Sequence, residues 1–91
     1  MTATPPPTAV TVLTRQDCAS CVQAKQVLNR VATEYPLSVQ EISLDTPPGR
    51  ELALAHGVTF APGVLLDGAL FSYGRLSERK LRRTLARRVG G

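Results

Sequence analysis

Residues 9–21, Ala-Val-Thr-Val-Leu-Thr-Arg-Gln-Asp-Cys-Ala-Ser-Cys, are the stretch that decides how this chain folds. The first six of them are mostly apolar and rich in β-branched side chains, which is typical of a strand buried on both faces. Residues 15–17 are polar and interrupt this run. From Cys18 to about Glu34 apolar residues recur at helical spacing, and Pro36 prevents continuation of the helix. The stretch therefore predicts a buried strand that leads directly into an amphipathic helix with two cysteines on its first turn.

The remainder of the chain continues the alternation of strands and helices. Residues 37–44 resume a strand pattern, Pro47-Pro48 and Gly57 offer the start and stop of a short helix, and Ser77 can cap a last helix. Two apolar runs, 63–66 and 69–73, surround an Asp-Gly turn and predict an antiparallel hairpin. The expected order is β-α-β-α-β-β-α, an α/β fold with a four-stranded mixed sheet flanked by helices.

Length and composition favour one small domain. The chain has 91 residues and 43% hydrophobic content, which suits a single compact unit over residues 9–89 after a flexible, Pro-rich tail at residues 1–8. No apolar stretch is long enough for a membrane span, and the N-terminus has no secretory pattern. Two cysteines this close together would close too small a loop to staple a secreted domain, so we expect a cytoplasmic location.

The motif Cys18-Ala19-Ser20-Cys21 carries the chemistry. At the start of a helix the first sulfur lies near unpaired backbone N–H groups and the positive end of the helix dipole, which stabilise a thiolate. Cys18 is therefore the expected nucleophile, with a pKa below the value of about 8.5 for a free thiol. Cys21, one turn further along, would resolve the mixed disulfide that Cys18 forms with a substrate. Arg15 adds positive charge just before the helix.

Other interpretations of two nearby cysteines stay open at this stage. They could be a structural pair. The domain that carries them could also be a redox-sensing or protein-binding module without catalysis. They could also be half of a metal site, but zinc normally takes four ligands and His56 is the only other soft ligand in the chain. A complete zinc site in one copy is therefore not expected, whereas a metal or iron-sulfur cluster shared by a dimer is an alternative.

The order and spacing of these features resemble the glutaredoxin branch of the thioredoxin superfamily over roughly residues 9–89. The features that carry the resemblance are a short strand, an arginine three residues before the first cysteine, Cys-Ala-Ser-Cys opening a helix, Ala61-Pro62 before an apolar strand, an Asp-Gly hairpin and a terminal helix. The resemblance implies a thioredoxin-like fold and disulfide oxidoreductase activity. It also implies a nucleophilic Cys18 and a resolving Cys21.

The same resemblance implies substrate-binding positions. Arg15 stands where glutaredoxins often have a lysine that contacts the carboxylate of glutathione. Pro62 matches a cis-proline that faces the cysteine pair, and the backbone of Ala61 would be offered to an extended thiol substrate. Gly74 and Ser77 match a glycine-rich turn and helix start that hold the far end of glutathione.

Three segments depart from the glutaredoxin pattern: Ala19-Ser20 between the cysteines, Phe60-Ala61 before the proline, and residues 74–77 after the hairpin. The residues therefore suit three electron donors, namely glutathione, another low-molecular-weight thiol or a flavin reductase. The expected substrates are protein disulfides or mixed disulfides with a small thiol. We expect a redox-active Cys18-Cys21 disulfide, a monomer, and no bound metal or organic cofactor.

The net charge of +4 is concentrated near the C-terminus, where lysine and arginine crowd residues 79–88. Such clusters can neutralise nucleic-acid phosphates. The segment has no aromatic residues for stacking and no recognisable nucleic-acid-binding motif, so we expect a solvated helix face and no nucleic-acid partner. An acidic protein surface is the better candidate for an interaction there.

Overall fold

The computed structural model describes residues 6–90, and for residues 89 and 90 it describes the backbone alone. The elements follow the predicted order: β1 (Thr8–Thr14), α1 (Ala19–Val31), β2 (Leu37–Ser43), α2 (Pro47–His56), β3 (Gly63–Leu66), β4 (Ala69–Tyr73) and α3 (Glu78–Gly90). Most of the predicted tail lies outside the described residues. Its last member, Thr8, already belongs to β1, because its N–H donates to the carbonyl of Pro36 (3.1 Å) as the sheet begins.

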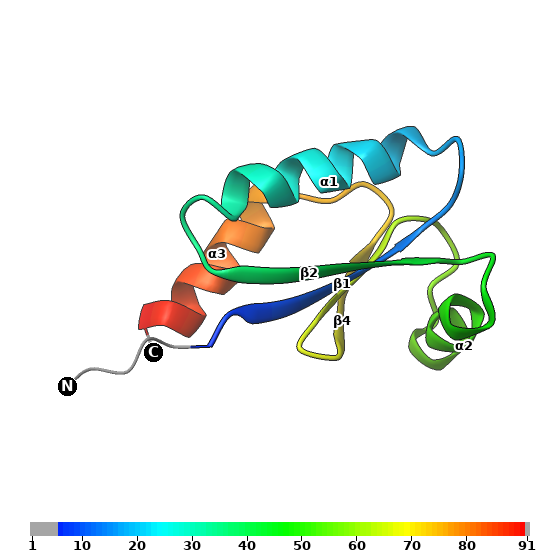
Figure 1. Cartoon of the computed structure of the whole chain (residues 1–91). Coiled ribbons are helices and arrows are strands. Elements are labelled where there is room, and N and C mark those ends of the chain that lie inside the picture. The colour runs from blue at the N-terminus through cyan, green and yellow to red at the C-terminus, as the bar shows by residue number, and fades with distance from the viewer. Residues whose placement is uncertain (1–5, 91) are drawn as a thin grey trace.

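The four strands form one mixed sheet in the order β2-β1-β3-β4. β1 pairs with β2 in parallel and with β3 antiparallel, and β3 and β4 form the predicted hairpin. α1 connects the two parallel strands and lies along one face of the sheet, while α2 lies on the other side near one end (Figure 1). The predicted fold class is confirmed.

One hydrophobic core joins the sheet to α1 and α3. Alternate residues of β1, Val10 and Val12, point to the same face as Val64 and Leu66 of β3. The helices and the loop before α3 supply the rest of this core: Ala24, Val27, Leu28, Val31, Leu76, Leu81 and Leu85. The apolar spacing predicted for α1 is thus the spacing that fills the core.

The bounds of α1 differ from the prediction at both ends. Cys18 is the N-cap with an extended backbone rather than a residue of the first turn, and the helix ends at Val31, well before Pro36. At that end the hydroxyl of Thr33 donates to the carbonyl of Arg30 (2.7 Å), and the N–H of Glu34 donates to Val31 (3.0 Å). These turn hydrogen bonds replace the helical pattern, so Pro36 is not what ends the helix.

Left-handed backbone conformations close two turns, as the sequence predicts. Gly57 ends α2 with φ 67°, and the Asp67-Gly68 turn has φ 48° and 84° at its two residues. The carboxylate of Asp67 accepts the N–H of Ala9 (2.9 Å), which is the main cause that lowers its pKa, and Arg88 contributes further. The hairpin turn is thereby fastened to the start of β1.

None of the helices within the described part of the chain is both long and apolar enough to cross a membrane.

A side chain of α1 holds the loop that leads into α3. The amide of Gln23 donates to the carbonyl of Leu76 (2.9 Å) and accepts the N–H of the same residue (3.2 Å). Leu76 is 1% exposed, so both of its backbone groups depend on this one side chain. Arg30 and Glu78 add an exposed ion pair between the same helices (2.8 Å), which contributes less because water screens it.

Replacing Gln23 with alanine should destabilise the fold by about 1–3 kcal/mol, because two backbone groups lose their partners. Gln26→Ala is the matched control, since Gln26 is exposed on the same helix and should change stability by less than about 0.5 kcal/mol. Urea unfolding of both variants measures the difference. Equal unfolding midpoints would show that Gln23 does not hold the loop.

Candidate functional site

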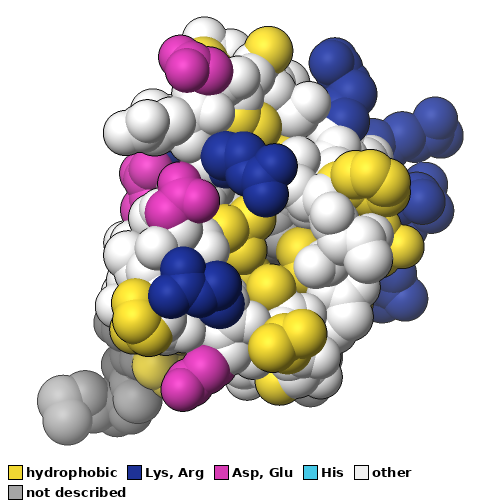
Figure 2. Space-filling view, turned by 90° about the vertical axis from the view of Figure 1, so that its right-hand side faces the viewer, with side chains coloured by type: hydrophobic (Ala, Val, Ile, Leu, Met, Phe, Trp, Pro, Cys, Tyr) yellow, Lys and Arg dark blue, Asp and Glu magenta, His cyan; other side chains and the backbone are white. Residues whose placement is uncertain are grey.

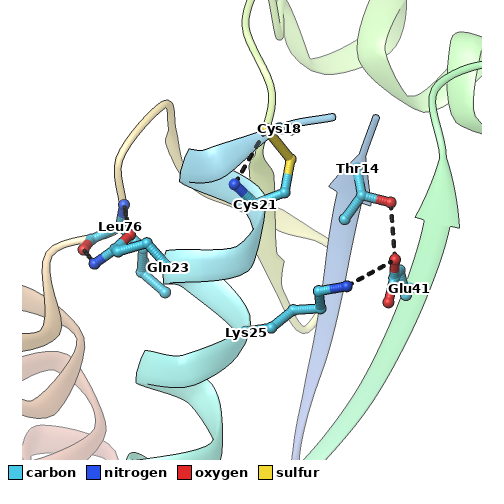
Figure 3. Close-up of a disulfide and its surroundings, with 7 residues drawn as sticks. All are labelled: Thr14, Cys18, Cys21, Gln23, Lys25, Glu41 and Leu76. Carbon is cyan, nitrogen blue, oxygen red and sulfur yellow. Dashed lines mark hydrogen bonds and ion pairs between the residues drawn. A yellow bond between two sulfur atoms is a disulfide. The ribbon is translucent and has the colours of Figure 1, made fainter. Parts of the chain in front are cut away.

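The cysteine pair lies at the junction between the end of β1 and the start of α1. Cys18 and Cys21 form a disulfide, with their Cα atoms 5.2 Å apart, at the N-terminal end of the helix (Figure 3). Cys18 is partly exposed, whereas Cys21 is 3% exposed and packs into the interior. The two sulfurs are therefore unequal in their access to a substrate, and Cys18 is the one that solvent reaches.

The backbone around Cys18 favours a negative charge on its sulfur. The N–H of Cys21 donates to Sγ of Cys18 (3.1 Å), so the sulfur itself caps the helix. The first turn of α1 contains no acidic residue that would oppose a thiolate. In the reduced protein the same N–H group and the helix dipole would stabilise the thiolate form of Cys18.

The segment before the disulfide turns sharply to bring Cys18 to the helix start. Asp17 adopts a left-handed backbone with φ 54°, a conformation that Asp tolerates better than most residues. Thr14, at the end of β1, is 5% exposed. The short polar segment 15–17 thus converts the direction of a buried strand into that of a helix on the sheet.

Ala61 and Pro62 are joined by the predicted cis peptide bond, immediately before β3. Leu13 of β1 is in register with Gly63, so Pro62 lies at the end of the sheet from which the chain proceeds to Cys18. Gly63 is also confined: a Cβ there would come within 2.9 Å of Val58. The cis bond is confirmed, and contact between Pro62 and the sulfurs stays a prediction.

The other predicted substrate-binding residues, Gly74, Ser77 and Arg15, do not form one site. Gly74 has φ 83°, and its N–H donates to the carbonyl of Pro62 (2.8 Å), so these two positions are together. Ser77 accepts the N–H of Lys80 (3.2 Å) and caps α3 as predicted, in a pocket between α1 and the start of α3. Arg15 is exposed and lines a separate pocket of about 390 Å³ formed with α2 and the loop before it.

A polar network that the sequence does not predict lies beside the disulfide. Thr14 donates to the carboxylate of Glu41 on β2 (3.1 Å), and Lys25 of α1 reaches the same oxygen (3.5 Å), as Figure 3 shows. Glu41 stands in an otherwise ordinary edge strand, and the register Val12↔Glu41 is what brings it to Thr14. The strand pattern alone holds no signal for such a cross-element contact.

The sequence also does not predict that Gln23 holds Leu76 by hydrogen bonds. Nor does it predict that the rings of Phe60 and Tyr73 stack on each other. The one signal in the sequence is that Phe60 departs from the glutaredoxin pattern before the proline. Within residues 6–90 no group of three or more His, Cys, Asp or Glu side chains is arranged to hold a metal ion.

Comparison with known proteins gives relatives over nearly the whole chain. Uncharacterised proteins of Mycobacterium tuberculosis and Mycobacterium bovis are 32% identical to it over 87 residues, which cover 90% of this chain and 87% of theirs. Because these relatives are themselves uncharacterised, they show kinship over nearly the whole chain and no activity.

Solved structures support the fold. The thioredoxin-like protein BC3987 matches with a TM-score of 0.69 at 24% identity, covering 84% of this chain and 99% of that one. A thioredoxin-like protein from Clostridium perfringens matches with a TM-score of 0.73 at 16% identity, covering 93% of this chain and 73% of the other. At these identities the likeness concerns the fold alone.

A family model described as the thioredoxin domain matches residues 8–86, which include every strand and both cysteines. The match agrees with the mixed sheet, the disulfide at the start of α1 and the cis-proline before β3. The fold together with the C-x-x-C pair supports a general redox role in thiol–disulfide chemistry. This chain belongs to the thioredoxin domain family.

Proposed function

We propose that the protein is a thiol–disulfide oxidoreductase that reduces protein disulfides, or mixed disulfides between a protein and a small thiol. The observation that carries the proposal is the inequality of the two sulfurs. Cys18 is accessible and its Sγ accepts a backbone N–H (3.1 Å), while Cys21 is buried one turn away within disulfide reach. An accessible stabilised thiolate with an internal thiol behind it is what dithiol exchange needs.

In the proposed cycle the thiolate of reduced Cys18 attacks one sulfur of the substrate disulfide. An S–S bond forms between Cys18 and the substrate, the substrate S–S bond breaks, and the leaving sulfur departs as a thiolate that takes a proton from water. The thiolate of Cys21 then attacks Sγ of Cys18 and releases the second substrate sulfur. Two electrons have passed to the substrate, and the protein is left with the Cys18–Cys21 disulfide seen in the structure.

A thiol or a reductase must return these two electrons. We propose glutathione, another low-molecular-weight thiol or a flavin reductase as the donor, and a monomer acting in the cytoplasm without a bound metal or organic cofactor. Offering the oxidised protein each donor class and following the appearance of free thiols discriminates between the donors.

Two results would contradict this proposal. If no thiol or reductase reduces the protein and no disulfide substrate is turned over, a sensing or binding module replaces the enzyme. Metal or iron in protein purified under anaerobic conditions would instead indicate a shared cluster.

The two cysteines should respond differently to replacement by serine. Cys18→Ser should lose all exchange, because a serine hydroxyl is not ionised at neutral pH. Cys21→Ser keeps the nucleophile and should accumulate a mixed disulfide with the substrate that a reductant releases. Mass spectrometry after incubation with a disulfide substrate identifies both species. A rapid adduct on Cys21 in the Cys18→Ser variant would show that the roles are reversed.

The pKa of Cys18 should lie below about 8.5, because a backbone N–H and the helix dipole favour its thiolate. Titration of the thiolate absorbance in Cys21→Ser reports this sulfur alone, and the same variant unfolded in urea supplies the reference. A lowered folded pKa stabilises the fold above the unfolded pKa, and this contribution is lost as pH falls through the folded pKa. Identical pKa values in the folded and unfolded protein would contradict the electrostatic role of the helix start.

Arg15 should favour a negatively charged thiol as the reductant, since it is exposed and stands three residues before Cys18. We expect Arg15→Gln to lower the rate of reduction by glutathione relative to the neutral thiol 2-mercaptoethanol by about two- to fivefold at low salt. Arg83→Gln is the matched control, because Arg83 is equally exposed but lies on α3. An unchanged ratio in Arg15→Gln would exclude this residue from thiol recognition.

A further inference from the structure

Two aromatic rings stack on each other at the surface instead of entering the core. Phe60 is 67% exposed and Tyr73 is 46% exposed, and their ring centroids lie 6.2 Å apart with 22° between the planes. Tyr73 is in register with Gly63, and the next residue, Gly74, donates its N–H to Pro62 (2.8 Å). The hairpin therefore holds Tyr73 beside Phe60, and the pair is built by the fold although most of its surface stays in water.

The pair lies at the reactive end of the sheet. Gly63, the first residue of β3, is in register with Leu13, and β1 continues from there to the segment that ends at Cys18. Figure 2 views the end of the molecule that carries the start of α1 and the helix α2, and hydrophobic side chains gather there with charged side chains of both signs around them. An exposed apolar patch of this kind is typical of a surface that binds a partner.

Ala61 follows Phe60 in the chain and forms the cis peptide bond with Pro62. Its backbone hydrogen-bonding groups are left without partners by the described part of the fold. Within residues 6–90 neither its N–H nor its carbonyl forms a backbone hydrogen bond, and it belongs to neither a helix nor a strand. Ala61 is only partly exposed. A polypeptide in extended conformation can supply both missing hydrogen bonds by lying alongside it.

We propose that the Phe60–Tyr73 pair selects the substrate, and that the substrate is an extended polypeptide disulfide with an aromatic or large aliphatic side chain next to its cysteine. This inference rests on the proposed thiol–disulfide exchange and names its substrate class. The two rings offer flat apolar area at little entropic cost and no formal charge, so they favour a nonpolar neighbour over a carboxylate. The substrate cysteine reaches Cys18 while its neighbouring side chain covers the rings.

The test compares short symmetrical peptide disulfides that carry phenylalanine, leucine, glycine or glutamate next to the cysteine. The protein is reduced with dithiothreitol, freed of reductant and mixed with each peptide, and the rate of peptide thiol release is measured. We expect the phenylalanine peptide to react about tenfold faster than the glycine peptide, the factor that corresponds to burial of a modest apolar contact. The glutamate peptide covers no apolar area, so it should also react more slowly than the phenylalanine peptide. Equal rates for all four peptides would overturn the proposal.

Variants connect the preference to the rings. Phe60→Ala combined with Tyr73→Ala should remove most of the tenfold preference, whereas Tyr73→Phe should keep it, because the ring and not the hydroxyl is required. Leu54→Ala is the matched control, since Leu54 on α2 is 84% exposed and apolar. An equal loss of preference in Leu54→Ala would show that general surface hydrophobicity, rather than the pair, is responsible.

A small non-peptide disulfide, hydroxyethyl disulfide, separates this inference from the proposed function. It has no side chain to cover the rings, so wild type and the double variant should reduce it at the same rate. If wild type does not reduce it or any peptide, thiol–disulfide exchange itself fails. If wild type reduces it and all peptides equally, exchange stands and the inference about the aromatic pair fails.

Discussion

The burial of β1 between β2 and β3 is the constraint on which the other features depend. Val10, Val12 and Leu13 are at most 1% exposed, and β1 pairs along its length with a parallel partner on one side and an antiparallel partner on the other. A strand that is hydrogen-bonded to a neighbour on each side cannot shift its register without breaking both sets of hydrogen bonds. That register fixes where β1 ends, and therefore where α1 can begin and where Cys18 lies.

The chemistry of the pair follows from this fixed junction. Because Cys18 is the N-cap of α1, its sulfur replaces the usual oxygen of a capping side chain and accepts the N–H of Cys21. Because Cys21 is one turn inward on the face that packs against the sheet, it is shielded from solvent. One helix start thus gives two chemically identical side chains different exposure and different hydrogen bonding.

Contacts between distant parts of the chain complete the surroundings of the disulfide. The hydrogen bond from Gly74 to Pro62 joins the end of β4 to the segment before β3, and it sets Tyr73 beside Phe60. The double hydrogen bond between Gln23 and Leu76 fastens the following loop to the helix of the cysteines. The proposed substrate-binding surface and the helix of Cys18 are therefore supported by the same few long-range contacts, so we expect a change in the hairpin to alter the surroundings of the disulfide.

The amino-acid sequence was enough to predict the order of the elements, the Asp-Gly hairpin, the glycine stop at residue 57 and the cysteine pair at a helix start, because these depend on periodicity and on the preferences of a few neighbouring residues. The cis state of Pro62 came from resemblance to a family, since X-Pro bonds are usually trans. Only the tertiary structure decided that α1 ends at Val31, that Glu41 meets Thr14, that Ser77 and Arg15 occupy separate pockets, and that Phe60 stacks on Tyr73. The end of α1 depends on turn hydrogen bonds that compete with the helix. The other three findings depend on strand register and helix packing, which bring distant groups together. Neither kind of interaction leaves a local pattern in the chain.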